Sequence, residues 1–485
     1  MKILLAAALL AASPAAAAPA TAPATLAASA STPRAAADDV SEARLHATVE
    51  ALVGFGTRHT LSSQTDPKRG IGAALRWAQD AFASDSQACG GCLAIVTPAE
   101  TFTGRRSPAG VSVHDVVAIQ RGTGDPNRVI LITGHIDSRV SDVMNATADA
   151  PGANDDGSGT AAVLEAARIL SRYRFPATIV YGVLMGEEQG LYGGQTLANY
   201  ARAQGWQVEA ELNNDIIGNS LGSDGLRDDT HVRLLSEGVR GDWTPDYIAA
   251  QRSLGGENDS PSRNLSRFVA GVESRLQLGL AVRQIWRTDR FGRGGDHIPF
   301  QQLGFPAVRF TVALENYNWQ HQDLRTENAI RYGDTIDRMD FPYLRKVVQL
   351  NVAALVALAS APPPPEPKVE GAVSTDTILT WPAESAAAYV VHWRPTDAAG
   401  WTQKVRVPAG AACSNGARSA GEGEHSVPAQ AGVAPACSRK LPHVRVDDWV
   451  FGVSSVSADG FESPVASAVP GGAFRPIPPA PAARP

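Results

Sequence analysis

Four runs of apolar, largely β-branched residues in the first 360 residues predict buried β-strands. They cover residues 128–137, 177–185, 208–218 and 305–314. Around them, apolar residues recur at helical spacing and predict helices over residues 71–84, 158–173, 193–204, 263–278 and 342–359. Nearly continuous apolar strands separated by helices are typical of a mostly parallel sheet that helices cover on both faces. This part of the chain therefore predicts an α/β fold.

The hydrophobic pattern changes after APPPPEP, residues 361–367, whose four consecutive prolines predict a stiff, extended linker. Residues 377–395 and 447–464 then alternate apolar and polar positions between turn residues, as short strands do. We therefore expect a C-terminal β-sandwich over residues 368–470 that resembles a fibronectin type III module. Its expected core aromatic residues are Trp381, Tyr389 and Trp393.

No catalytic constellation occurs in this C-terminal part, so we expect a module that binds a partner of unknown kind or stabilises the chain. A removable, chaperone-like extension is the alternative. Residues 471–485 are expected to form a disordered tail. Residues 21–37, which are rich in Ala, Pro and Thr, are expected to form a disordered spacer or propeptide before an α/β domain at residues 38–360.

The N-terminal sequence MKILLAAALLAASPAAAAPA has the features of a secretory signal peptide: one lysine, a short Leu/Ala run and small residues at A-x-A spacing. We expect residues 1–20 to be this signal, cleaved after Ala18 or Ala20. A membrane anchor is the alternative, but the run is shorter than the ~20 residues that a spanning helix needs, and Pro14 interrupts it. We expect no other membrane span, and a protein that is secreted or periplasmic.

Composition and cysteine content agree with an exported globular protein. Of 485 residues, 44% are hydrophobic and 19% are charged, and the net charge of −6 gives no indication of nucleic acid or of an anionic membrane as a partner. In a cytosolic protein, the CGGC sequence of Cys89 and Cys92 would suggest redox or zinc chemistry. After a signal peptide we expect two local disulfides instead, the second joining Cys413 to Cys437.

Candidate chemistry appears where the predicted strands end. His135 and Asp137 alternate at the end of the first strand, so the carboxylate can lie beside the imidazole and orient it, as a metal-bound histidine usually requires. A surface histidine is the alternative. GANDDGSG, residues 152–159, then places two acids in a glycine-rich turn before a helix. Helix capping by Asp156 or Ser158 would account for one polar side chain but leaves Asp155 unexplained. The turn is not a phosphate loop, because it lacks GK[ST] and its acids would repel phosphate.

Two adjacent carboxylates, Glu187 and Glu188, end the next strand in GVLMGEEQGLYGG. Burying either is costly unless positive charge compensates it. Asp215 also lies late in a strand, and His321 follows the strand at 305–314. Taken singly, these two residues could be an exposed acid and a surface loop histidine.

Taken together, two histidines and several acids converge on the carboxyl edge of one predicted sheet, where such folds bind ligands. Mixed nitrogen and oxygen donors with this excess of acid suit a pair of zinc ions better than one closed structural site. Two such ions can share a bridging carboxylate and a water molecule. One residue of the Glu187–Glu188 pair would then bind metal, and its neighbour would accept the proton of the water.

The order of these motifs closely resembles the secreted zinc aminopeptidase family, which includes bacterial leucyl and aminoacyl aminopeptidases and glutamate carboxypeptidases. The resemblance covers roughly residues 40–358 and extends to GFGTRHT and GGDHIPF. It implies that His135 and Asp215 hold one zinc and that Glu188 and His321 hold the other. Asp155, the acid that precedes x-x-Ser-Gly, would bridge the two ions. The resemblance also implies that Glu187 is the general base and that Asp137 orients His135.

Two departures qualify the resemblance. The last ligand stands in Trp-Gln-His-Gln-Asp, without the usual aromatic residue before His321 and threonine after it, so His297 is a rival ligand. Asp296 and His297 are otherwise expected to shape the pocket or support the core. Residues 219–262 resemble an insertion that covers or extends the pocket.

The expected activity is hydrolysis of peptides by a secreted di-zinc exopeptidase, foremost an aminopeptidase. Carboxypeptidase or dipeptidase action is the alternative within the family. Glutaminyl cyclase is less favoured because a one-metal cyclase would not need the full ligand set, and a non-catalytic receptor would have lost ligands.

Overall fold

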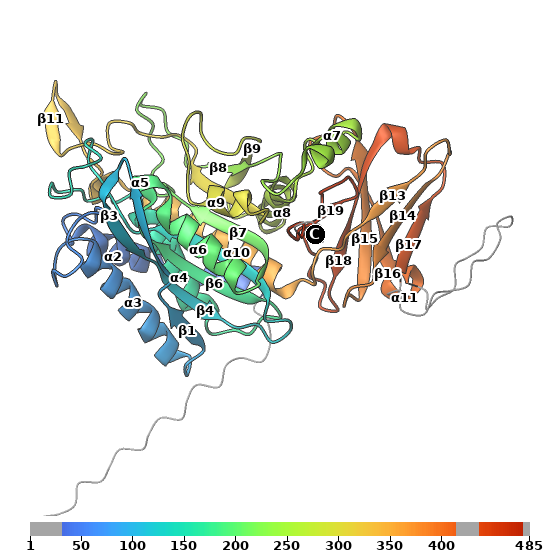
Figure 1. Cartoon of the computed structure of the whole chain (residues 1–485), viewed down its shortest axis with the longest axis horizontal. Helices are drawn as coiled ribbons and strands as arrows, with labels where there is room; N and C mark the ends of the chain where they lie inside the picture. The colour runs from blue at the N-terminus through green and yellow to red at the C-terminus, as the bar shows by residue number, and fades with distance from the viewer. Residues whose placement is uncertain (1–31, 414–435, 479–485) are drawn as a thin grey trace, which may run out of the picture.

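The computed structural model describes residues 32–413 and 436–478, which form an α/β domain and a C-terminal β-module beside it (Figure 1). The predicted signal peptide lies outside the described residues, as do residues 21–31 of the predicted spacer. Both expected disulfides, Cys89–Cys92 and Cys413–Cys437, are present.

The core of the first domain is an eight-stranded mixed sheet. Its strands are, in spatial order, β1 (Leu93–Val96), β4 (Val116–Gln120), β6 (Thr178–Leu184), β5 (Arg128–His135), β7 (Gln207–Asn214), β10 (Ala307–Val312), β8 (His231–Ser236) and β9 (Ala281–Ile285). The neighbours from β6 to β10 pair in parallel, whereas β4 and β8 join this central block in antiparallel fashion. The expected mostly parallel sheet is therefore confirmed. β8 falls within residues 219–262, so this segment adds a strand to the sheet.

Helices cover both faces of the sheet (Figure 1). On one face lie α2 (Glu42–Val53), α3 (Ile71–Ala88), α4 (Gly157–Leu170), α8 (Pro261–Leu276) and α10 (Phe341–Ser360). On the other face lie α6 (Tyr192–Ala203) and α9 (His297–Gln302). Among the described helices, α10 alone is long and apolar enough to cross a membrane, but 78% of its apolar window is buried inside the protein, as in a core helix.

Shorter elements surround this core. They are the hairpin of β2 (Ala99–Gly104) and β3 (Ser107–His114), the helices α5 (Glu187–Gly190) and α7 (Pro245–Ser253), the hairpin of β11 (Arg325–Glu327) and β12 (Ile330–Tyr332), and a 3-10 turn at Ile336–Arg338.

The C-terminal module consists of two antiparallel sheets that share one apolar core. One contains β13 (Lys368–Glu370), β14 (Thr377–Pro382) and β17 (Ala436–Leu441), and the other contains β16 (Gln403–Pro408), β15 (Ala388–Pro395), β18 (Trp449–Val456) and β19 (Ala466–Ser467). The chain passes between the two sheets through the short helix α11 (Ala409–Ala412) and through a 3-10 turn at Val446–Asp448. Trp381 and Tyr389 are buried as expected, whereas Trp393 is half-buried at the edge of this core.

The predicted spacer is wrong at its C-terminal end, because helix α1 (Pro33–Asp38) begins before residue 38. Thr32 caps this helix by accepting a hydrogen bond from the Ala35 amide. Ala36 and Ala37 are buried, and Gln349 of α10 donates a hydrogen bond to the Ala37 carbonyl. Alanine-rich sequence is a good helix former, and the burial that stabilises it here comes from a partner three hundred residues away.

The predicted disordered tail is also wrong as far as residue 478. Phe474 is buried, and Arg240 donates hydrogen bonds to the carbonyls of Ala473 and Arg475 at 2.6 and 2.7 Å. The Ile477 amide donates to Asp242 at 2.7 Å. The proline-rich linker similarly contains no helix or strand but is largely buried. The composition of these segments does not reveal that they pack against the first domain.

Candidate metal centre

The predicted site residues meet at one edge of the central sheet. His135 ends β5, Glu187 and Glu188 follow β6, and Asp215 follows β7. Their strands are neighbours and run parallel, so their carboxyl ends open on the same side. His321 lies on the loop after β10, the next strand in the sheet.

These side chains form two groups whose ligand-type atoms lie within 4.8 Å of one another. The first group contains His135, Asp155 and Asp215, and its His135 Nε2 lies 3.2 Å from Asp155 Oδ1 and 3.8 Å from Asp215 Oδ1. The second group contains Asp155, Glu188 and His321, and its His321 Nε2 lies 2.8 Å from Asp155 Oδ2 and 3.0 Å from Glu188 Oε1. Asp155 therefore belongs to both groups and turns a different oxygen toward each histidine.

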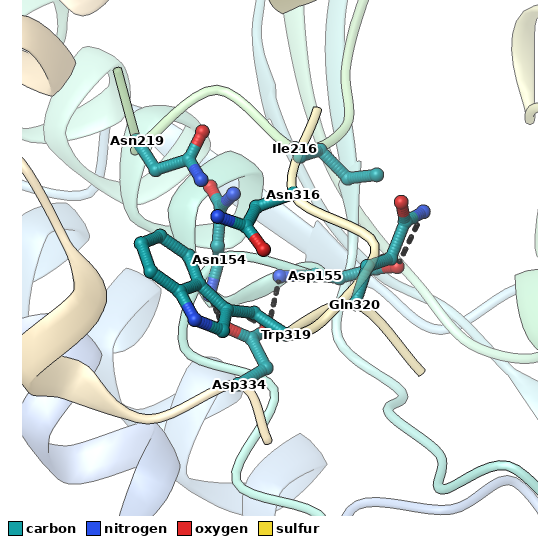
Figure 2. Close-up of a pocket in the computed structure, with 8 residues that line it drawn as sticks. All are labelled: Asn154, Asp155, Ile216, Asn219, Asn316, Trp319, Gln320 and Asp334. Atoms are coloured by element: carbon teal, nitrogen blue, oxygen red, sulfur yellow. Dashed lines mark hydrogen bonds between the residues drawn. The ribbon is translucent and has the colours of Figure 1, made fainter. Parts of the chain in front are cut away.

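Asp155 is held by hydrogen bonds with the chain segment after β10, which contains Gln320 and Asp334. Its backbone amide donates to Asp334 at 2.7 Å, and Gln320 donates to its Oδ2 at 3.2 Å (Figure 2). The Asn154 amide also donates to Asp334 at 3.0 Å. Figure 2 shows the small pocket of about 10 Å³ that these residues line with Trp319, room for about one water molecule. The backbone at the proposed bridge is thus fixed before any ligand binds.

Asp156 has a structural role at the start of α4. It caps the helix by accepting the Gly159 amide at 2.8 Å, as the capping interpretation predicts. The same carboxylate accepts the amides of His135 at 3.1 Å and Ile216 at 3.2 Å. It thereby ties the helix to the ends of β5 and β7, from which two of the site residues project.

Asp137 supports the site in two ways. Its Oδ1 lies 3.4 Å from His135 Nδ1, and its backbone carbonyl lies 3.0 Å from the same nitrogen. Its carboxylate also accepts the backbone amides of Gly186, Glu187 and Glu188 at 3.0–3.2 Å, and the Thr60 hydroxyl at 2.7 Å. Asp137 therefore orients the turn that carries both glutamates as well as the imidazole.

The electrostatics of both groups favour bound positive charge. Burial opposes protonation of His135, but the adjacent carboxylates outweigh burial and raise its pKa well above the ordinary value. Burial likewise opposes charge on His321, yet Glu188 and Asp155 raise its pKa to about 9. Glu187 differs from the two histidines in that its neutral form is favoured. Its side chain is half-buried, and burial raises the pKa of its carboxyl group well above the usual range. A bound metal ion would supply positive charge beside the carboxylates of both groups, in place of the proton that these carboxylates favour on each histidine.

Two atoms of these groups fit a metal ion directly. His135 Nε2 and Glu188 Oε1 are buried, and neither is paired in a well-aligned hydrogen bond among the described residues. Each faces another member of its ligand group instead, Asp155 at 3.2 Å and His321 at 3.0 Å. Such unpaired polar atoms are rare in folded proteins and call for a ligand. Imidazole nitrogen and carboxylate oxygen are donors that zinc accepts. The donor set and the two unpaired atoms therefore fit zinc.

His321, rather than His297, occupies the second group. His297 Nε2 lies 2.8 Å from the Thr288 carbonyl, and the residue belongs to neither group. Asp296 accepts the Gly194 amide at 3.1 Å and is fully buried. His321 adopts φ 55°, in the left-handed region that few non-glycine residues enter, and such conformations concentrate at functional sites.

The sequence analysis missed four residues that hold the site together: Arg58, Arg139, Arg309 and Asp334. Arg58 is fully buried and donates to the carbonyls of Ile136, Pro151 and Gly152, which flank the motifs. Arg309 contacts Asp215, and Arg139 contacts Glu188 and His321. Two of the four carried a sequence signal: Arg58 lies in GFGTRHT, and Arg139 continues the alternation of residues 135 and 137.

Comparison with known proteins identifies the family. The sequence profile of peptidase family M28 matches residues 115–341. A probable zinc metalloprotease of Leptosphaeria maculans is 40% identical over 446 residues, which cover 90% of this chain and 97% of that protein. A probable zinc metalloprotease of Pyricularia oryzae is also 40% identical, over 90% of this chain and 84% of its own length.

Among solved structures, LapA of Legionella pneumophila aligns with a TM-score of 0.50 at 19% identity, over 68% of this chain and 76% of its own. This likeness shows the fold. Both relatives are fungal, whereas the resemblance seen in the sequence was to a family that includes bacterial members. They are 40% identical to this chain over 97% and 84% of their own lengths, and this similarity supports the family assignment. The chain belongs to peptidase family M28.

Proposed function

We propose that this chain is a secreted di-zinc exopeptidase that removes N-terminal residues from peptides. One observation carries the proposal: the two carboxylate oxygens of Asp155 face different histidines, at 3.2 and 2.8 Å. A carboxylate placed in this way is suited to bridge two metal ions. The disulfides support an oxidising compartment. The family resemblance supports aminopeptidase action.

In this proposal His135 and Asp215 hold one zinc ion, Glu188 and His321 hold the other, and Asp155 bridges them. Asp137 keeps His135 Nε2 turned toward the first group through its contacts with Nδ1. Bound zinc would polarise the scissile carbonyl and acidify the attacking water.

Glu187 is the proposed general base. It stands next to Glu188 in sequence, yet it lies outside both ligand groups and is half-buried. Its backbone amide is fixed by Asp137 at 3.2 Å, which holds the start of its side chain at the site. Its carboxylate accepts the proton of the attacking water and returns it to the leaving amine.

The test is mass spectrometry of a peptide pool incubated with the zinc-loaded mature protein, with N-termini free in one half and acetylated in the other. We expect stepwise shortening from free N-termini only. Shortening of both halves from the C-terminus would favour the carboxypeptidase alternative. Loss of water or ammonia from N-terminal Glu or Gln without cleavage would favour a cyclase, and an unchanged pool would refute an enzyme of either kind.

A further inference from the structure

Arg139 contacts two residues of the second ligand group at once. Its Nε donates to Glu188 Oε2 at 2.7 Å, and its Nη2 lies 2.6 Å from His321 Nδ1. Only 15% of its side chain is exposed. The oxygen that it contacts is not the unpaired Glu188 Oε1, so Arg139 restricts Glu188 to binding a metal through one oxygen.

The first ligand group has a matching arginine whose charge is neutralised. Arg309 Nη2 lies 2.8 Å from Asp215 Oδ2, and its Nη1 lies 2.9 Å from Asp289, which belongs to neither group. Arg139 forms an ion pair with no carboxylate other than Glu188 in the described parts of the chain. The cation beside the second group therefore has no ion pair outside the ligands in the described parts of the chain, unlike the cation beside the first.

The contact between Arg139 and His321 also opposes a metal. A guanidinium group has only donors, so Arg139 places a donor, and no acceptor, at His321 Nδ1. The other ring nitrogen, Nε2, faces Asp155 and Glu188 at 2.8 and 3.0 Å. A metal on Nε2 would move the proton to Nδ1, where it would meet the Arg139 donors. Metal-bound histidines ordinarily turn the other nitrogen toward an acceptor.

We propose that Arg139 weakens metal binding at the group of Asp155, Glu188 and His321, so that zinc fills the group of His135, Asp155 and Asp215 first and the second group only at higher concentration. This inference rests on the proposed two-zinc site. Three properties of Arg139 act in the same direction: its positive charge, which forms an ion pair only with a ligand; its contact with one Glu188 oxygen; and the donor that it places at His321 Nδ1.

The experiment is a zinc titration of the full-length, metal-free mature protein against a chromophoric chelator, which yields two stepwise dissociation constants. The variants are Arg139→Gln, which removes the charge, and Arg139→Lys, which retains it. Arg106→Gln is the matched control, because Arg106 donates to the Glu188 backbone carbonyl at 2.7 Å and contacts no ligand atom. Circular dichroism verifies that each variant folds.

For the wild type we expect a second dissociation constant at least tenfold weaker than the first. Arg139→Gln is expected to tighten the second step at least tenfold and to change the first less than threefold, within the range by which outer contacts alter metal affinity. Arg139→Lys and Arg106→Gln are expected to keep the wild-type gap. Two equal wild-type constants, or a second step that Arg139→Gln weakens, would overturn the inference while leaving the two-zinc proposal intact. Failure of every form to bind a second zinc would overturn both.

Discussion

A buried carboxylate, Asp259, lies at the contact between the two domains, and Asp259→Asn should weaken that contact. Asp259 is fully buried at the start of α8. Arg394 of β15 lies 2.5 Å from its Oδ2, and Arg267 of α8 lies 3.4 Å from its Oδ1. Asn264 also donates to Ser467 of β19 at 2.8 Å. A charged network thus links the α/β domain to the C-terminal module.

The expected loss of stability follows from the burial of the two arginines. Their side chains are only 1% and 6% exposed, and burial lowers the pKa of Arg267 to about 10. Removing one partner of a buried ion pair usually costs about 3–5 kcal/mol, because the other charge remains buried. Asparagine retains one acceptor oxygen, and Arg394 keeps its 2.7 Å bond to the Ala398 carbonyl. We therefore expect Asp259→Asn to cost about 3 kcal/mol, at the lower end of that range.

The assay is urea unfolding of zinc-loaded wild type and variant, followed by tryptophan fluorescence. Trp401 and Trp286 lie beside the arginines of the network and report on it directly. The matched control is Asp376→Asn, which weakens a partly exposed 2.8 Å pair with Lys440 and should change the free energy of unfolding by less than about 1 kcal/mol. A loss below about 1 kcal/mol for Asp259→Asn would refute the reasoning, since it would mean that the two arginines are not effectively desolvated.

Three further predictions address the site and the pH response. Glu187→Gln should bind as much zinc as the wild type but lower kcat about 10²–10⁴-fold, because it removes the proton acceptor; unchanged turnover in the presence of saturating peptide would exclude this role. Burial raises the carboxyl pKa of Glu237 to about 8, above its unfolded value of 4.5, so the folded state retains a proton that the unfolded state loses, and stability falls between these pH values. Glu237→Gln should therefore raise the melting temperature at pH 9 and change it little at pH 5, and an equal change at both pH values would contradict this assignment. Removal of zinc by a chelator should abolish peptide hydrolysis and lower the melting temperature, and readdition of zinc should restore both; hydrolysis that continues in the zinc-free protein would contradict a metal-dependent reaction.

Local patterns predicted four strands of the central sheet, β5, β6, β7 and β10, because these strands are buried on both faces. The shorter strands β1 and β4 were not predicted. The runs ending near His135 and Asp215 are continuous, and the glycine-rich turn before α4 is marked by residue type. β8 and β9 were not predicted because these outer strands are only partly covered: β8 has half-exposed positions among its buried ones, and β9 has only exposed and half-exposed positions. α1 and the tail were mispredicted because only distant partners bury them.

The candidate ligands were predicted because each occupies a strand end or a recognisable turn. Asp334 and Arg309 occupy neither kind of position. Asp334 accepts hydrogen bonds from the backbone amides of residues 154 and 155, and Arg309 forms an ion pair with Asp215. The fold brings these residues together from positions about 100 to 180 residues apart. Arg139 adjoins the His135 motif, but its contact with His321 also depends on the folding of a distant loop.

The most direct test of the two-metal site is the zinc content of wild type and Asp155→Ala, measured by native mass spectrometry of the mature protein after zinc loading. Asp155 belongs to both ligand groups. We predict two zinc ions per wild-type chain and none retained by Asp155→Ala under the same conditions, because each ion loses a ligand and the bridge between them. A variant that still carries two zinc ions would contradict the bridging role of Asp155 and the site built on it.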